Sequence, residues 1–143
     1  MKFGPIEDFD QWGKDAKERL DGRVVVASVS GGKDSTALAI LLQEAGIPYR
    51  AIHMDTGWEH EDTERYVREF LPGLLGKEID IIQSKWGGME ELVLKKGMFP
   101  SRVRRFCTQE LKVRPMQKYI KAIDDECVNV VGIRAAESAS RAK

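Results

Sequence analysis

Short apolar runs alternate with amphipathic segments along this chain. The run 24–29, VVVASV, is rich in β-branched residues, which is typical of a strand that is covered on both faces of a parallel sheet. The same patterns predict further strands at 49–55, 78–84 and 127–133, and helices at 35–45, 60–71, more weakly 87–96, and from Pro115 onward. This alternation predicts an α/β fold with a doubly wound, mostly parallel sheet and helices on both faces.

Two of the predicted helices are amphipathic, so one face of each is expected to pack on the sheet. The expected inner faces are Thr63, Val67, Phe70 and Leu71 in the first helix, and Met116, Tyr119, Ile120 and Ile123 in the second. Proline suits the first turn of a helix because its missing N–H needs no partner there. Pro115 is therefore expected to mark the beginning of the second helix.

Length and composition are those of one ordinary globular domain, so residues 1–143 are expected to form a single unit. The 23 basic and 23 acidic side chains cancel, and the overall charge gives no support to a nucleic-acid or membrane partner. No apolar run approaches the roughly 18 residues that cross a bilayer, so a cytoplasmic protein is expected. Cys107 and Cys127 are too few for a disulfide framework or a four-thiolate zinc or iron–sulfur site.

The segment SGGKDS, residues 30–35, lies where the first strand gives way to the first helix. In an open parallel sheet, ligands bind at the carboxyl ends of the strands. Gly31 and Gly32 allow close approach of the backbone, while the N–H groups of a helix start, Lys33 and two serine hydroxyls favour an anion. The segment fits neither the Walker A pattern nor the G-x-G-x-x-G fingerprint, so it predicts a different phosphate-binding loop.

SGGKDS resembles the pyrophosphate loop of the nucleotide α-hydrolase, or ATP-pyrophosphatase, superfamily, which has a Rossmann-like three-layer fold. The resemblance implies that the loop holds the β- and γ-phosphates of ATP, or an equivalent anion, while chemistry takes place at the α-phosphate. The implied phosphate-binding residues are Ser30, Gly31, Gly32, Lys33, Asp34 and Ser35. The resemblance also makes Lys33 and Asp34 candidate catalytic residues.

A second segment, HMDTGWEHEDT at 53–63, resembles the D-T-G-x-E segment of the phosphoadenosine-phosphosulfate (PAPS) reductase-like branch. Asp55, Thr56 and Gly57 are therefore expected beside the nucleotide. Because magnesium prefers oxygen ligands, Asp55 and Asp34 are candidate ligands for an ion on the phosphates. The alternative is that Asp55, Thr56 and Gly57 only form a turn. For the acidic side chains beyond Glu59 we favour a solvated helix N-terminus.

The third segment, 101–121, is strongly basic. It has seven cations, Arg102, Arg104, Arg105, Lys112, Arg114, Lys118 and Lys121, against the single acid Glu110. Its first half resembles the R-x-C-T-x-x-L-K-x-x-P segment of the reductase-like family. This implies that Arg104, Arg105 and Lys112 lie near the sulfate or phosphate end of the nucleotide, with Arg105 a candidate catalytic residue. Lys118 and Lys121 are expected on a solvated face outside the site.

The fourth segment, VVGIRAAESASR at 130–141, resembles the family's G-I-R-x-x-E-S-x-x-R ending. The resemblance implies that Arg134 and Arg141 bind the same anion and that Glu137 and Ser138 orient them. The bare sequence would otherwise indicate only the start of a helix.

Thiol chemistry separates the functional hypotheses. Arg104 and Arg105 favour a Cys107 thiolate, which makes Cys107 a candidate catalytic nucleophile, whereas a structural role is the alternative. Cys127, at the start of a strand, is expected to be an inert apolar residue. The family's reductases use a cysteine in an E-C-G-L-H tail or further paired cysteines for an iron–sulfur cluster, and this sequence has neither. A minimal or truncated family member without an iron–sulfur cluster is expected.

Three functions follow from these observations. The first is an enzyme that cleaves the α–β bond of ATP, transfers the adenylyl group and releases pyrophosphate. The second is a reductase or sulfur-transfer enzyme that acts on PAPS or adenylyl sulfate, in sulfur metabolism. The third is a nucleotide-binding module without turnover in a larger assembly. All three predict an adenine nucleotide as ligand, leave a protein partner or a homodimer open, and predict no direct nucleic-acid or membrane ligand.

Overall fold

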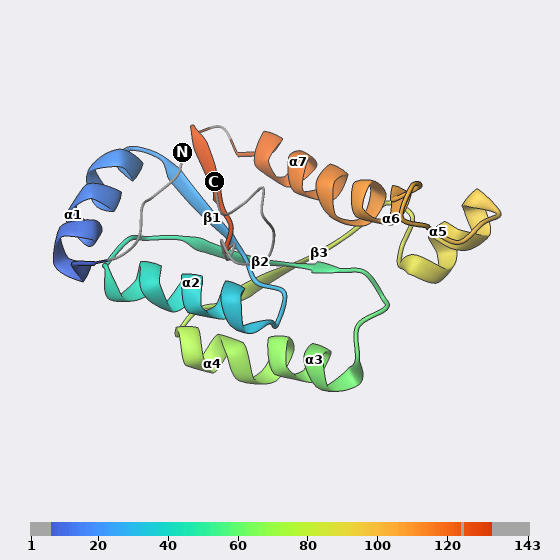
Figure 1. Cartoon of the computed structure of the whole chain (residues 1–143), viewed down its shortest axis with the longest axis horizontal. Helices are drawn as coiled ribbons and strands as arrows, with labels where there is room; N and C mark the ends of the chain where they lie inside the picture. Colours follow the sequence, from blue (N-terminus) through green and yellow to red (C-terminus); the bar gives the residue numbers. More distant parts are fainter. Residues whose placement is uncertain (1–6, 124, 133–143) are drawn as a thin grey trace.

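The structure is a computed structural model that describes residues 7–123 and 125–132. Its strands are β1 (Val24–Ser28), β2 (Arg50–Asp55), β3 (Ile79–Gln83) and β4 (Cys127–Val130), and they form one sheet in the order β3-β2-β1-β4. Each pair of neighbours is parallel. The carboxyl ends of all these strands therefore face the same edge of the sheet, which confirms the predicted parallel α/β fold (Figure 1).

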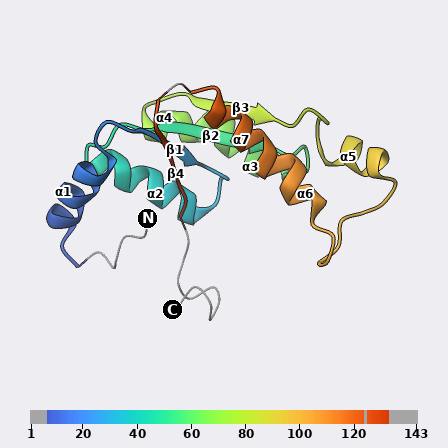
Figure 2. The same ribbon diagram turned by 90° about the horizontal axis from the view of Figure 1, so that it is seen from above.

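Helices cover both faces of the sheet (Figure 1). The helices α2 (Lys33–Glu44), α3 (Glu61–Arg65) and α4 (Leu71–Leu75) lie on one face, and α6 (Phe106–Thr108) and α7 (Arg114–Lys121) lie on the other. The helix α5 (Met89–Lys96) projects beyond the end of the sheet, as both ribbon views show (Figures 1 and 2). None of the helices in the described part of the chain is long and apolar enough to span a membrane.

The central strand β1 is buried as its sequence predicts. Val25, Val26 and Ala27 are all at most 3% exposed, because helices cover the strand on both sides. The following helix begins at Lys33, two residues before the predicted start. Gly32 is the N-cap in an extended conformation, and its carbonyl accepts bonds from the Thr36 N–H at 3.2 Å and hydroxyl at 2.9 Å.

The helix α1 (Phe9–Leu20) was missing from the predicted elements. Asp8 caps it by accepting a hydrogen bond from the Gln11 N–H at 3.1 Å, and Ala16 and Leu20 join the core that also contains residues of α2. The signal was present, since an N-cap aspartate precedes small and apolar residues at helical spacing.

The predicted helix at 60–71 is interrupted by a π-helical segment, η1 (Tyr66–Phe70). Val67 and Leu71 are completely buried, as predicted, but Phe70 is 57% exposed, so its assignment to the inner face was wrong. The wider π turn rotates Phe70 away from the sheet. Its ring instead stacks on Tyr66 with a centroid distance of 5.2 Å.

A second π-helical segment, η2 (Gln109–Val113), joins α6 to α7. Pro115 lies in the first turn of α7, but the helical path already begins at Phe106, so the predicted start at Pro115 was wrong. The Arg114 N–H donates to the Gln109 carbonyl, five residues back. The missing N–H of Pro115 therefore coincides with the change in hydrogen-bond register, which lets proline follow a helical turn.

Candidate functional site

Residues 30–35, which we call the phosphate loop, form a compact turn at the carboxyl end of β1. The Ser30 N–H donates to the Ser35 hydroxyl at 3.1 Å, and the two serine hydroxyls are 3.2 Å apart. The Ser35 hydroxyl also donates to the Gly32 carbonyl at 3.2 Å. These contacts link both ends of the loop and hold its backbone in one conformation.

Gly31 determines how closely the phosphate loop approaches the neighbouring helix. Its φ is +86°, a conformation that favours glycine. A Cβ at this position would lie 2.9 Å from the Thr63 methyl carbon and 3.1 Å from a methyl carbon of Val67. Both the backbone conformation and the contact with α3 and η1 therefore require glycine.

The phosphate loop ends at the N-terminus of α2, which has 12 residues and no side-chain hydrogen bond at its N-cap. The first N–H groups of a helix point outward with the positive end of its dipole. Lys33 is exposed at this end of the helix, and Asp34 and Ser35 are half-buried beside it. The arrangement suits an anion such as a phosphate group.

Gly132, in the segment after β4, packs on the same helix start. A Cβ on Gly132 would lie only 2.7 Å from the Asp34 carbonyl oxygen. Gly132, which belongs to the fourth sequence segment, thus packs against the phosphate loop at Asp34. The predicted ligands Arg134 and Arg141, and with them Glu137 and Ser138, lie outside the described residues.

The D-T-G segment at the end of β2 forms a turn that docks on the start of α5. One Asp55 carboxylate oxygen accepts from the Gly57 N–H at 2.9 Å, and the other accepts from the Arg68 guanidinium at 3.1 Å. Thr56 is buried, and its carbonyl accepts from the Met89 N–H at 2.7 Å. Gly57 has a φ of +68°, and a Cβ there would lie 3.1 Å from the Gly88 Cα.

These contacts bear on the magnesium assignment. Both carboxylate oxygens of Asp55 already have protein donors, and within residues 7–123 and 125–132 no group of three or more His, Cys, Asp or Glu is arranged to hold a metal ion. The protein groups in these ranges do not form a metal site of their own. Asp34 and Asp55 as ligands of a nucleotide-bound magnesium ion stay a prediction.

A cavity of about 430 Å³ lies between the D-T-G segment and the basic segment. Its lining includes Thr56, Trp58, Glu59, Phe99, Cys107 and Lys112. The fold therefore brings Thr56 together with Cys107 and Lys112 around one cavity. The aromatic side chains of Trp58 and Phe99 were not predicted, because nothing local to either residue indicates that the two meet.

Arg104 and Arg105 are not among the residues that line this cavity. Both side chains are exposed, and the Arg104 guanidinium lies 3.7 Å from the Met98 sulfur. Arg105 is the N-cap residue of α6. Their proposed contact with the anionic end of a nucleotide is not made by the protein alone and stays a prediction.

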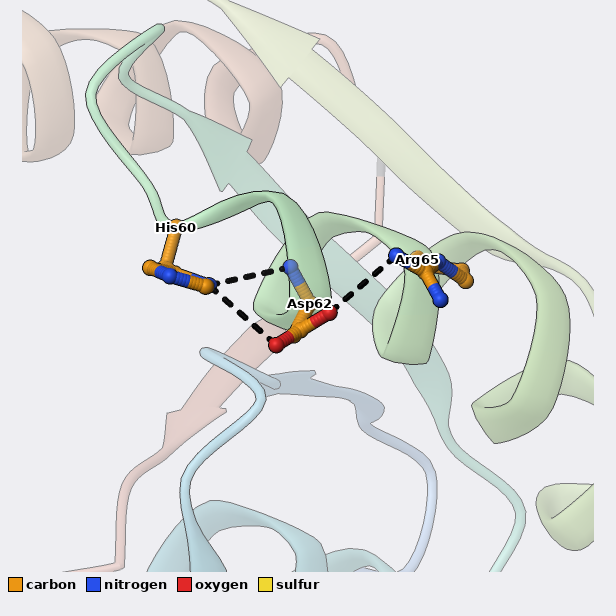
Figure 3. Close-up of polar contacts among 3 residues, drawn as sticks. All are labelled: His60, Asp62 and Arg65. Atoms are coloured by element: carbon orange, nitrogen blue, oxygen red, sulfur yellow. Dashed lines mark hydrogen bonds and ion pairs between the residues drawn. The ribbon is translucent and has the colours of Figure 1, made fainter.

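The acidic residues beyond Glu59 form the start of α3 (Figure 3). The His60 imidazole accepts a hydrogen bond from the Asp62 N–H at 3.2 Å, and the Asp62 carboxylate pairs with Arg65 at 3.1 Å. These local contacts support the interpretation of this cluster as a helix N-terminus.

His53 is a buried residue that the sequence interpretation left without a role. Its imidazole Nδ1 lies 2.7 Å from the Val29 carbonyl oxygen, immediately before the phosphate loop. This contact ties the end of β1 to β2. The only local signal was a polar residue between the apolar residues Ile52 and Met54 of β2.

The two cysteines have different surroundings. Both are free and half-buried. Burial raises the pKa of the Cys127 thiol, with Arg50 opposing the shift, which agrees with an inert role. Cys107 instead lines the 430 Å³ cavity.

A parallel α/β sheet with a glycine-containing turn at its carboxyl edge defines a class of proteins that bind ligands at that edge. Within this class of proteins, the sequence identifies one family. Residues 24–143 match the phosphoadenosine phosphosulfate reductase domain, and the chain belongs to this family.

The chain is also similar to individual proteins. The chain is 30% identical to an uncharacterized 37.8 kDa protein of Escherichia phage 186, over 90% of this chain and 52% of the relative. It is 35% identical to an uncharacterized protein of Methanocaldococcus jannaschii, over 90% of this chain and 26% of the relative. It is also 32% identical to a subunit of the glutamine-hydrolyzing GMP synthase of Saccharolobus islandicus, over 68% of this chain and 28% of the relative. The chain thus spans about half or less of the length of these relatives.

Among solved structures, the phosphate complex of phosphoadenylyl-sulfate (PAPS) reductase from Candida auris has the same fold. The two superpose with a TM-score of 0.63 over 94% of this chain and 70% of the other, at 17% sequence identity.

Proposed function

We propose that this protein binds an adenine nucleotide and cleaves the α–β phosphate bond of ATP, with adenylyl transfer and release of pyrophosphate. The observation that carries the proposal is the phosphate loop. It combines the closed serine pair, the glycine-dependent turn at Gly31 and an N-terminus of α2 without a side-chain cap. Similarity to a component of a synthase supports a synthase type of reaction.

In this proposal the phosphate loop binds the leaving group. A nucleophile of the acceptor attacks the α-phosphorus, the bond to the oxygen that bridges to the β-phosphorus breaks, and pyrophosphate leaves with the electron pair. The backbone N–H groups at the start of α2 hold the pyrophosphate oxygens, the Ser30 and Ser35 hydroxyls turn from their contacts within the loop to donate to the same oxygens, and Lys33 offsets the charge that develops on them. Magnesium bound to the phosphates would supply further charge neutralisation.

The basic residues outside the phosphate loop have proposed roles toward the same nucleotide. Arg104, Arg105 and Lys112 supply positive charge to the polyphosphate or to the acceptor, with Arg105 the proposed catalytic cation. Lys112 already lines the 430 Å³ cavity, which is large enough for a small acceptor. Arg134 and Arg141 are proposed ligands of the same anion. A protein partner or a second copy of the chain is compatible with these roles.

A reductase or sulfur-transfer enzyme that acts on PAPS is the second candidate function. Its support is that Cys107 lines the cavity together with Lys112. In that reaction the Cys107 thiolate would attack the sulfonyl sulfur, the bond from that sulfur to the bridging phosphate oxygen would break, and adenosine 3′,5′-bisphosphate would leave. An external dithiol would then attack the Cys107 sulfur, release sulfite, and be oxidised to a disulfide as the Cys107 thiol is regenerated. Cys107 lies in α6, which continues directly into η2 and α7, so its sulfur has little freedom to move between nucleotide and reductant. This position favours the first function.

Product analysis separates these functions. The purified chain is incubated with ATP and magnesium, and separately with PAPS and thioredoxin, and the products are identified by mass spectrometry. We expect AMP or an adenylylated acceptor together with pyrophosphate. Sulfite from PAPS would support the second function. Nucleotide binding by calorimetry without any product would support a binding module in a larger assembly.

A further inference from the structure

A second cavity, of about 400 Å³, lies between the end of β3 and the helix α7. The roles proposed for the nucleotide site do not involve it. Its volume falls within the range of small-molecule sites. The charged groups of its lining are Lys85, Arg114, Lys118 and Glu110.

The single acidic group in this lining is already neutralised. Glu110 is only 5% exposed, and its carboxylate accepts from the Trp86 indole N–H at 2.9 Å and pairs with Arg114 at 2.7 Å. The indole hydrogen bond is the main cause that lowers the pKa of Glu110, so the group is ionised at neutral pH. Glu110 and Arg114 therefore cancel.

Two positive charges remain in excess. Lys85 and Lys118 line the cavity, and neither forms an ion pair with another residue of 7–123 or 125–132. The Lys85 ammonium lies 4.7 Å from the centroid of the Trp86 ring, a contact that leaves its charge uncompensated. An ammonium pair of this kind in a recess attracts an anion.

The lining of the second cavity also includes a hydroxyl group and apolar groups. Ser84 is 7% exposed, and its hydroxyl accepts from the Trp86 N–H at 3.2 Å while its own proton has no acceptor among the described residues. Pro115 and the Tyr119 ring form an apolar side of the lining. The Tyr119 hydroxyl donates to the Asp80 carboxylate at 2.8 Å, which holds the ring in place.

The π-helical segment η2 separates this cavity from the 430 Å³ cavity. Leu111 and Lys112 line the 430 Å³ cavity, whereas Glu110 and, at the start of α7, Arg114 line the second cavity. Insertions of this type are frequent at functional sites, because they turn adjacent side chains to different surroundings.

We propose that the second cavity binds a small organic anion, a carboxylate or phosphate monoester on a ring or short aliphatic frame. The anionic group contacts Lys85, Lys118 and the Ser84 hydroxyl, and the apolar frame lies against Pro115 and Tyr119. This site is independent of the nucleotide function proposed above.

Nuclear magnetic resonance of the 15N-labelled full chain tests the proposal, with phenyl phosphate and inorganic phosphate as probes. We expect phenyl phosphate to shift the amide signals of residues 84–86, 114 and 116–122 with one saturable affinity, and inorganic phosphate to bind there more weakly. Signals of residues 30–36 report separately on the phosphate loop, so binding at that loop alone overturns the proposal without affecting the nucleotide function.

Matched lysine variants test the role of the charges. Lys85→Ala and Lys118→Ala are each expected to weaken phenyl phosphate binding at this site by about fivefold or more, whereas Lys121→Ala, on the same helix as Lys118 but outside the lining, is expected to stay within about twofold. Neither lysine makes an ion pair that stabilises the fold, and the spectrum itself reports folding. Equal losses in all three variants would indicate diffuse electrostatic attraction and overturn the proposal, as would affinities unchanged from wild type.

Discussion

The phosphate loop and the segment that joins α5 to α6 differ in how firmly the fold holds them. The loop is closed by the Ser30–Ser35 contacts, and Gly31 lies so near α3 and η1 that a Cβ there would clash with them. The α5–α6 segment carries Arg104 and Arg105 but is tied mainly to itself, through two bonds of 3.1 Å between Ser101 and Arg104. Its Phe99 and Val103 are 69% and 93% exposed.

This difference indicates that the fold pre-organises the phosphate loop but not the arginines of the proposed nucleotide site. Backbone amides for the phosphates are in place at the start of α2, and fixed donors cost little to use because they need no reorganisation. In the proposed complex, Arg104 and Arg105 of the α5–α6 segment must move toward the nucleotide, because neither lines the 430 Å³ cavity. Substitutions in the loop are therefore expected to affect binding more than substitutions in the segment.

The largest effect is expected for Gly32→Val combined with Lys33→Ala. The double variant should abolish measurable ATP binding in calorimetry, since it blocks the close approach of the phosphates and removes a charge. Folding should persist, because Gly32 has an ordinary φ of −83° and the nearest atom to its added Cβ, the Ser30 hydroxyl oxygen, is 3.4 Å away. The control is Gly73→Ala with Lys14→Ala, at exposed positions far along the chain from the loop. ATP affinity equal to wild type in a folded double variant would refute the assignment of the loop.

The next effect concerns the α5–α6 segment. Arg105→Ala should weaken ATP binding by about 10- to 150-fold, which corresponds to the loss of one charge-assisted hydrogen bond of about 1.5–3 kcal/mol. Lys121→Ala removes the same charge from α7 and should have little effect. ATP should also displace any oligonucleotide that binds weakly to this surface. Tight, steeply salt-dependent binding of an oligonucleotide without competition by ATP would instead indicate a nucleic-acid site.

A smaller effect is expected where the fourth segment meets the loop. Gly132→Ala places a Cβ 2.7 Å from the Asp34 carbonyl oxygen, so the start of α2 or the segment after β4 must shift. We expect a loss of about 1–3 kcal/mol in the free energy of unfolding, measured with urea, together with weaker ATP binding. Val131→Ala, at the neighbouring half-exposed position, is the control. An unchanged stability and affinity would show that this contact is not needed to place the loop.

The smallest effect is expected for Cys107→Ser. ATP affinity should stay within about threefold of wild type, a difference below about 1 kcal/mol, because the thiol supplies no charge to the phosphates. Wild-type protein with PAPS and thioredoxin should release no sulfite. Sulfite that is formed by wild type and lost in Cys107→Ser would make Cys107 the nucleophile and place the reductase function first.

The phosphate loop and its two neighbouring elements could be predicted, because short-range backbone preferences determine them. A β-branched run, two glycines and a helix-forming segment each act through their own backbone preferences, so strand β1, the phosphate loop and α2 could be predicted from residues 24–45. The exit of β2 at Asp55 was predictable for the same reason.

Long-range packing decided the rest. Thr56 and Cys107 line one cavity although about 50 residues separate them. The reason is that the α6–η2–α7 helical path packs on the face of the sheet that contains β2. The exposed position of Phe70 and the helical path before Pro115 depend on the hydrogen-bond registers of η1 and η2. A π turn is locally much rarer than an α turn, so the packing of buried neighbours such as Val67 and Leu111 determines where one forms.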